Sequence, residues 1–93
     1  MPRFQIAHVR EQGVDLIIVL VSSSFENESA SKQNRIIAEL QLRARRAGLG
    51  GTVVPVWIRG DAIMSMAPKA WHPFFQTITT DWVAININRE LYW

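Results

Sequence analysis

Residues 14–21, "VDLIIVLV", contain the longest apolar run of the chain and decide the fold that we predict. The run is rich in Val and Ile and shows no polar alternation. A short run of this kind is typical of a strand that is covered on both faces, at the centre of a sheet. It is far shorter than the roughly 20 apolar residues that a membrane helix needs, so we predict no membrane span.

The segment before this strand predicts a neighbouring strand. Residues 3–10, "RFQIAHVR", alternate with a period of two, which indicates a strand with one wetter face. Residues 11–13, "EQG", form a short turn that contains a glycine. Two strands separated by such a turn predict an antiparallel hairpin.

The segment after the central strand predicts an amphipathic helix over residues 29–47. Apolar residues recur there at helical spacing, namely Ile36, Ile37, Leu40, Ala44 and Ala47. Asn27 or Ser29 can cap the first turn, because their side chains accept hydrogen bonds from free backbone N–H groups. Gly48 predicts the end of the helix, since glycine readily adopts the left-handed conformation found there.

Two further strands are predicted in the second half of the chain. Residues 52–58, "TVVPVWI", are rich in β-branched residues and indicate a third strand. Pro55 cannot donate a hydrogen bond to a neighbouring strand, which indicates an edge strand or a bulge. Residues 59–66 are expected to form a turn and connector. Residues 81–88, "DWVAININ", alternate again and predict a fourth strand.

A short helix is predicted over residues 68–78. It is expected to begin at Pro68, and Pro73 is expected to interrupt or end it. Its rings at positions 71, 74 and 75 are spaced so that one helical face can carry all of them toward the sheet.

The order of these elements predicts a single α+β domain over residues 1–93, arranged β-β-α-β-(short α)-β. The β-α-β unit is expected to be a right-handed crossover that makes the second and third strands parallel. The sheet is then mixed and four-stranded, with the long helix packed on one face. Because one helix covers one face only, we expect residues 61–78, a partner chain or both to cover the other.

Composition excludes several kinds of chemistry. The chain has no cysteine, which excludes disulfides and thiolate metal ligands, and its only histidines are His8 and His72. Residues 22–24, His72 and an aspartate supply the residue types of a hydrolytic triad, but no nucleophile motif accompanies them. We therefore predict no catalytic residue, no metal and no cofactor, and favour a protein that is not an enzyme. The N-terminus lacks the pattern of a signal peptide, so we expect a cytoplasmic protein.

Polar residues follow both parallel strands of the predicted crossover. Ser22, Ser23 and Ser24 come after the second strand, and Arg59 comes after the third. Ligands in such folds bind beyond the carboxyl ends of parallel strands, near a helix N-terminus. Serine hydroxyls, helix amides and an arginine can together hold a phosphate or a carboxylate. These residues are the candidate ligand site, although the loop lacks the glycines of a nucleotide-binding fingerprint.

Aromatic residues are concentrated in the second half of the chain. The candidate interface consists of Trp57, Trp71, Phe74, Phe75, Trp82 and Trp93. Protein interfaces are enriched in aromatic residues and Met, and Met64 and Met66 lie beside this set. The leading hypothesis is a non-enzymatic protein-interaction domain, either a homodimer or a subunit of a larger assembly. Alternatively, the same rings form a second layer of the domain's own core.

The predicted helix is basic over residues 32–46, where five basic residues against one Glu give a local charge of +4. A basic face can meet phosphates, so weak nucleic-acid binding is a further alternative. The net charge of the whole chain is only +2, and Glu39 is spaced to pair with Arg35 and Arg43 along the helix. No nucleic-acid-binding motif supports this alternative.

Overall fold

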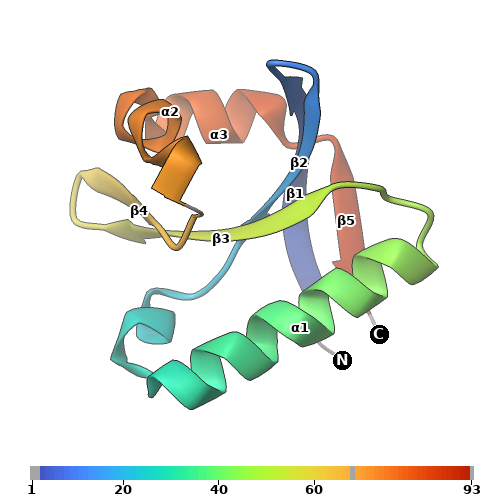
Figure 1. The fold of residues 1–93 in the computed structure, drawn as a ribbon. Coiled ribbons are helices and arrows are strands. Elements are labelled where there is room, and N and C mark those ends of the chain that lie inside the picture. Colours follow the sequence, from blue (N-terminus) through green and yellow to red (C-terminus); the bar gives the residue numbers. More distant parts are fainter. Residues whose placement is uncertain (1–2, 68, 93) are drawn as a thin grey trace.

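Five strands form the sheet in the described part of the chain, which is residues 3–67 and 69–92 of this computed structural model. They are β1 (Arg3–Glu11), β2 (Val14–Leu20), β3 (Thr52–Arg59), β4 (Ala62–Ser65) and β5 (Arg89–Tyr92). Their order across the sheet is β4-β3-β2-β1-β5 (Figure 1). β2 and β3 pair in parallel, and the other neighbours pair antiparallel. The predicted α+β class, mixed sheet and parallel crossover are confirmed, whereas the predicted count of four strands is wrong.

β2 is the central strand, as its apolar run predicts. The side chains from Leu16 to Val19 are at most 1% exposed and divide between the two faces of the sheet. β1 and β2 form the predicted hairpin through Gln12 and Gly13, whose φ angles are +51° and +78°. Positive φ at both central residues is the pattern of a type I′ turn, whose twist matches that of the paired strands.

Helix α1 (Ala30–Arg46) lies on one face of the sheet and confirms the predicted amphipathic helix (Figure 1). The hydroxyl of Ser29, its N-cap, accepts a hydrogen bond from a first-turn N–H over 3.2 Å. At the other end Gly48 has a φ of +83°, and the Leu49 N–H donates to the Ala44 carbonyl. This Schellman motif folds an apolar residue back onto the helix. In the described residues, no helix is both long and apolar enough to span a membrane.

The opposite face is covered by the second half of the same chain (Figure 1). This layer consists of η2 (Lys69–Trp71), α2 (His72–Thr77) and α3 (Thr80–Asn86). The predicted short helix is therefore present, although Pro68, its expected first residue, lies outside the described residues. Pro73 neither interrupts nor ends α2. It lies in the first helical turn, where its missing N–H would have had no partner within the helix.

Residues 81–88 do not form the predicted fourth strand, because most of them belong to α3. The residues of this segment that are buried or half-buried are Trp82, Val83, Asn86 and Ile87. Their spacing is that of one helical face, and the apparent alternation through Ile85 leaves that side chain 82% exposed. The hydroxyl of Thr79 caps the helix by accepting the N–H of the third helical residue over 3.1 Å.

Residues 59–66, predicted to be a turn and connector, form a second hairpin that contains β4. Arg59 pairs with Ala62 across a two-residue turn, and Gly60 has a φ of +62°. Positive φ at the first central residue alone is typical of a type II′ turn, which also suits antiparallel strands. The four-residue strand that follows is too short for its alternation to be visible in the sequence.

Pro55 lies neither in an edge strand nor at a bulge, because β3 pairs in unbroken register with β2 and is flanked by β4. Its backbone groups face β4 just beyond the end of that strand, where the Met66 N–H donates to the Pro55 carbonyl over 3.1 Å. The return bond would need the N–H that proline lacks. The proline therefore ends the β3–β4 ladder instead of placing β3 at an edge.

β5 is held against β1 by Asn88, which lies between α3 and β5. The Asn88 N–H donates to the Ile6 carbonyl over 3.0 Å. Its side-chain oxygen accepts the His8 N–H at 2.9 Å, and its side-chain nitrogen donates to the His8 carbonyl at 3.0 Å. The side chain thus bonds to β1 as a strand residue would, and it sets the position at which β5 begins.

Candidate functional site

The loop after β2 contains the predicted ligand residues Ser22, Ser23 and Ser24, and all three are exposed. Ser22 precedes the short 3-10 helix η1 (Ser23–Asn27), to which Ser23 and Ser24 belong, and α1 begins only after η1. The Ser22 hydroxyl caps this turn by accepting the Ser24 N–H at 3.3 Å, and the Ser24 hydroxyl donates to it at 3.1 Å. Two of the three hydroxyls are therefore already bonded to each other.

Arg59 lies close to η1, as the parallel-strand argument predicts, but an acidic side chain is its partner. Its Nε is 3.6 Å from Oε1 of Glu26, and the Trp57 indole N–H donates to Oε2 of the same carboxylate over 3.0 Å. Sequence reasoning missed Glu26, because its indole contact joins residues 31 positions apart and no local spacing announces it. A carboxylate at this position disfavours a phosphate between Arg59 and the serine loop.

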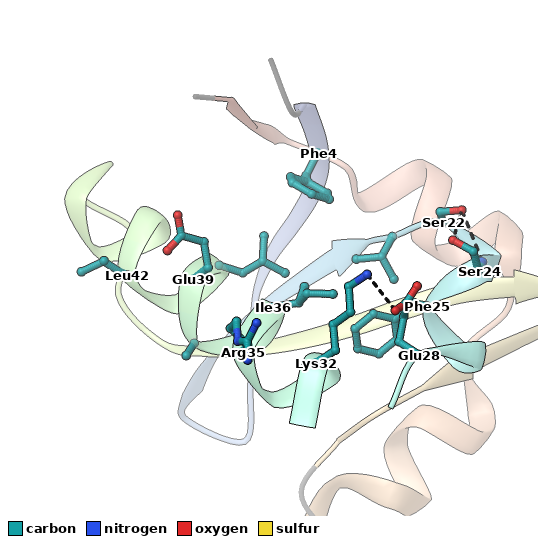
Figure 2. A pocket seen from close by; sticks show the side chains of 13 residues that line it. Phe4, Ser22, Ser24, Phe25, Glu28, Lys32, Arg35, Ile36, Glu39 and Leu42 are labelled. Atoms are coloured by element: carbon teal, nitrogen blue, oxygen red, sulfur yellow. Dashed lines mark hydrogen bonds and ion pairs between the residues drawn. The ribbon is translucent and has the colours of Figure 1, made fainter. Parts of the chain in front are cut away.

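A groove runs between α1 and the start of β1, and we call it the α1 groove (Figure 2). Its volume is about 680 Å³. Its floor is apolar and consists of Phe4, Val21, Phe25, Ile36 and Leu40. Ser22 and Ser24 lie at one end of it, so the predicted ligand loop borders a groove, although an apolar one.

Charged side chains of α1 and of the residues before it form the rim of the α1 groove. The Lys32 ammonium contacts the Glu28 carboxylate at 2.9 Å, a pair that Figure 2 marks. The Arg43 Nε contacts the Glu39 carboxylate at 3.0 Å. Arg35 is exposed on the same rim, and none of the described residues forms an ion pair or hydrogen bond with its guanidinium.

The aromatic residues of the second half mainly cover their own sheet. Phe74 is the centre of the cluster, with its ring centroid 5.9 Å from Trp71, 5.1 Å from Phe75 and 5.7 Å from Trp82, all near perpendicular. Such edge-to-face pairs are the geometry that aromatic rings favour. Phe75 is only 4% exposed, whereas Trp71, Phe74 and Trp82 are half-buried.

Trp57 belongs to the opposite face. It is 6% exposed and packs against Phe25 of η1 at a centroid distance of 5.2 Å, with the two ring planes tilted by 52°. Trp57 and Phe75 therefore offer a partner little surface, and Trp93 lies outside the described residues. The second face of the sheet is therefore covered by helices of the same chain, which carry the aromatic cluster.

β4 forms an open edge of the sheet. Along an antiparallel pair, residues that bond to the partner strand alternate with residues that do not. The Met66 N–H donates to β3, so the backbone groups of Met64 and Met66 face β3. The N–H and C=O groups of Ile63 and Ser65 face outward, and no other described residue bonds to them.

A second groove, the α2 groove, lies between this edge and helix α2. Its volume is about 530 Å³. Its walls are the residues 61–65 of the β4 hairpin, His72, Phe75 and Gln76 of α2, and residues 78–80. Ile63 and Ser65 pair with the β3 residues Ile58 and Val56, so their side chains lie on this face of the sheet. Ile58 is 46% exposed, which extends the apolar surface along the hairpin.

The two histidines each contact a backbone carbonyl. His8 Nε2 lies 3.0 Å from the Gly50 oxygen, and His72 Nε2 lies 3.0 Å from the Ala67 oxygen. Within the described ranges, no group of three or more His, Asp or Glu side chains could hold a metal ion.

Comparison of the chain with protein-family models, curated proteins and solved structures found no match.

Proposed function

We propose that this chain is a non-enzymatic protein-interaction domain that works as a homodimer, joined through the open edge of β4. The observation that carries the proposal is the outward direction of the backbone N–H and C=O groups of Ile63 and Ser65. A strand edge of this kind is a template for pairing with another strand. An uncharged edge strand favours such pairing, because Lys, Glu or Pro at an edge would oppose it.

A second copy supplies a strand that fits. In antiparallel pairing about a two-fold axis, Ile63 lies opposite Ser65 of the second copy, and the same pairing repeats across the axis. Met64 then lies opposite its counterpart, so no like charges meet. The sheets of the two copies would join into one, with the α2 layers on the same side and the two α2 grooves facing each other.

This proposal keeps the leading hypothesis from the sequence but changes the residues that carry it. The aromatic layer covers the strands β1, β2 and β3, whereas the strand edge and the α2 groove would meet the partner. Ile58 and Ile63, beside each other on the hairpin, add apolar area next to the hydrogen bonds. Apolar contact beside polar backbone bonds is the usual composition of a specific interface.

The test is the mass of the particle in solution, measured by light scattering at micromolar concentration. Ser65→Pro removes an outward N–H while leaving the bonds to β3 intact, because proline is tolerated where the N–H of an edge strand faces outward. We expect the mass of a dimer for the natural chain and for Ser65→Ala, which keeps the N–H. We expect the mass of a monomer for Ser65→Pro. A monomer in all cases would refute the proposed pairing.

A further inference from the structure

We infer that the α1 groove binds an amphiphilic small molecule, an apolar chain with a carboxylate head, whose head is held by Arg35. This inference is independent of the proposed dimer, because the α1 groove and the β4 edge have no residue in common. It alters the ligand site expected from sequence, since the cation is Arg35 and not Arg59.

The floor of the groove suits an apolar chain. Phe4 comes from β1 and Ile36 comes from α1, and they lie on opposite sides of the groove (Figure 2). Phe25 and Leu40, which are 4% and 1% exposed, close the bottom. Burying an apolar chain against such a surface is favourable in proportion to the apolar area removed from water.

The charges on the rim select an anionic head. Glu28 and Glu39 line the groove, but each contacts a basic side chain one helical turn further on. Arg35 is therefore the charged side chain of the rim that no described residue neutralises. A guanidinium can bind a carboxylate through two parallel N–H bonds, and it does so more strongly beside an apolar surface than in open water.

The size of the groove favours a small molecule over a segment of a partner protein. Its volume of about 680 Å³ lies within the range of small-molecule sites, roughly 300–1,000 Å³. The α1 residues that line it, from Lys32 to Leu42, extend along the helix for about 15 Å. A partner helix about 10 Å wide would occupy roughly 1,200 Å³ over that length, which exceeds the volume of the groove, so part of it would lie outside the groove.

The experiment is a titration of the natural chain with decanoate, followed through the methyl NMR signals of Ile36, Leu40 and Val21. We expect saturable shifts of these signals, with no comparable shifts for Ile63 and Ile78 in the α2 groove. Decanol, which has the chain without the charge, is expected to bind at the same site with lower affinity. Acetate, which has the charge without the chain, is expected not to bind.

Arg35→Gln tests the role of the guanidinium. We expect it to weaken decanoate binding about tenfold, as loss of a charge-assisted hydrogen bond does, and to leave decanol binding unchanged. The matched control is Arg45→Gln, because Arg45 is an exposed arginine of the same helix that does not line the groove. The Arg45 variant is expected to bind decanoate as the natural chain does.

Several results would overturn the inference. An absence of saturable shifts with decanoate would do so, as would equal losses from the Arg35 and Arg45 variants. Shifts of the Ile36 and Leu40 methyls on raising the protein concentration alone would show that a second copy, not a small molecule, fills the groove.

Discussion

The two edges of the sheet differ in how they meet solvent. β5 carries Arg89 and Glu90, and Glu90 pairs with Arg3 of the neighbouring strand at 3.2 Å. β4 consists of Ala62, Ile63, Met64 and Ser65, none of which is charged. Charged side chains on an edge strand oppose pairing with another chain, because pairing would place them in an interface. The charges on β5 therefore oppose pairing at that edge, whereas β4 has no charge that would oppose it.

The difference in charge favours the β4 edge as the one that pairs with a second chain. Both edge strands are four residues long, so strand length does not distinguish them. The β5 edge is further fixed by the Asn88 side chain, which ties it to β1, whereas β4 is tied to β3 alone up to its last bond at Pro55. Three changes test this contrast, and their expected effects on the free energy of unfolding decrease from the first to the third.

A proline substitution in β4 should have the largest effect when it replaces a residue whose N–H faces β3. Met64→Pro removes an N–H that faces β3, and we expect it to lower the free energy of unfolding by about 3 kcal/mol, through a lost bond and an unsatisfied carbonyl. Ser65→Pro should cost less than about 1 kcal/mol, because its N–H faces outward. Urea unfolding at protein concentrations where both variants are monomeric measures the two values. Equal losses would mean that the direction of the edge groups is wrong.

Freeing β5 from β1 should have an intermediate effect. Asn88→Ala removes the side-chain bonds to the His8 N–H and carbonyl, and we expect a loss of about 1–2 kcal/mol. Asn34→Ala is the control, since Asn34 is exposed and no bond to its side chain is seen in the described residues. Urea unfolding gives the stability, and faster exchange of the His8 amide localises the loss. An unchanged His8 amide would contradict the bridging role of Asn88.

Removing the two charged side chains of β5 should have the smallest effect on stability and a measurable effect on the size of the assembly. For the double variant Arg89→Thr, Glu90→Thr we expect a change of roughly 0.5 kcal/mol, because exposed ion pairs contribute little. With both edges open, however, each copy can pair on two sides, and sedimentation should reveal particles larger than the dimer. If the variant sediments as the natural chain does, charge is not what protects the β5 edge.

The sequence predicts the elements whose signals are long and consistent. The apolar run of residues 16–21 and the capped apolar stripe of residues 29–47 led to β2, α1 and the parallel crossover. Residues 81–88 were wrongly predicted to be a strand, because a helical face and a strand alternation share Val83 and Ile87. Only Thr79, the N-cap of α3, marks the start of a helix in the sequence. β4 and β5 escaped prediction because four residues are too few to show a period.

The candidate site was predictable in place but not in chemistry. The rule about the ends of parallel strands predicts Arg59 near the loop after β2, and Arg59 contacts Glu26 of η1 in that region. The carboxylate of Glu26 and the apolar floor that Phe4 supplies depend on tertiary contacts between distant segments, which no local pattern encodes. The direction of the β4 backbone groups likewise follows from the pairing register and not from residue type.

Amide hydrogen exchange at Ile63 and Ser65 measures whether their outward N–H groups bond to a second copy, as we propose. The Met64 amide faces β3 and is the internal reference, expected to exchange slowly at every concentration. We expect the Ile63 and Ser65 amides to exchange slowly at high protein concentration and to speed up on dilution, as the dimer dissociates. Fast exchange of both amides at every concentration, with Met64 protected, would rule out pairing through the β4 edge.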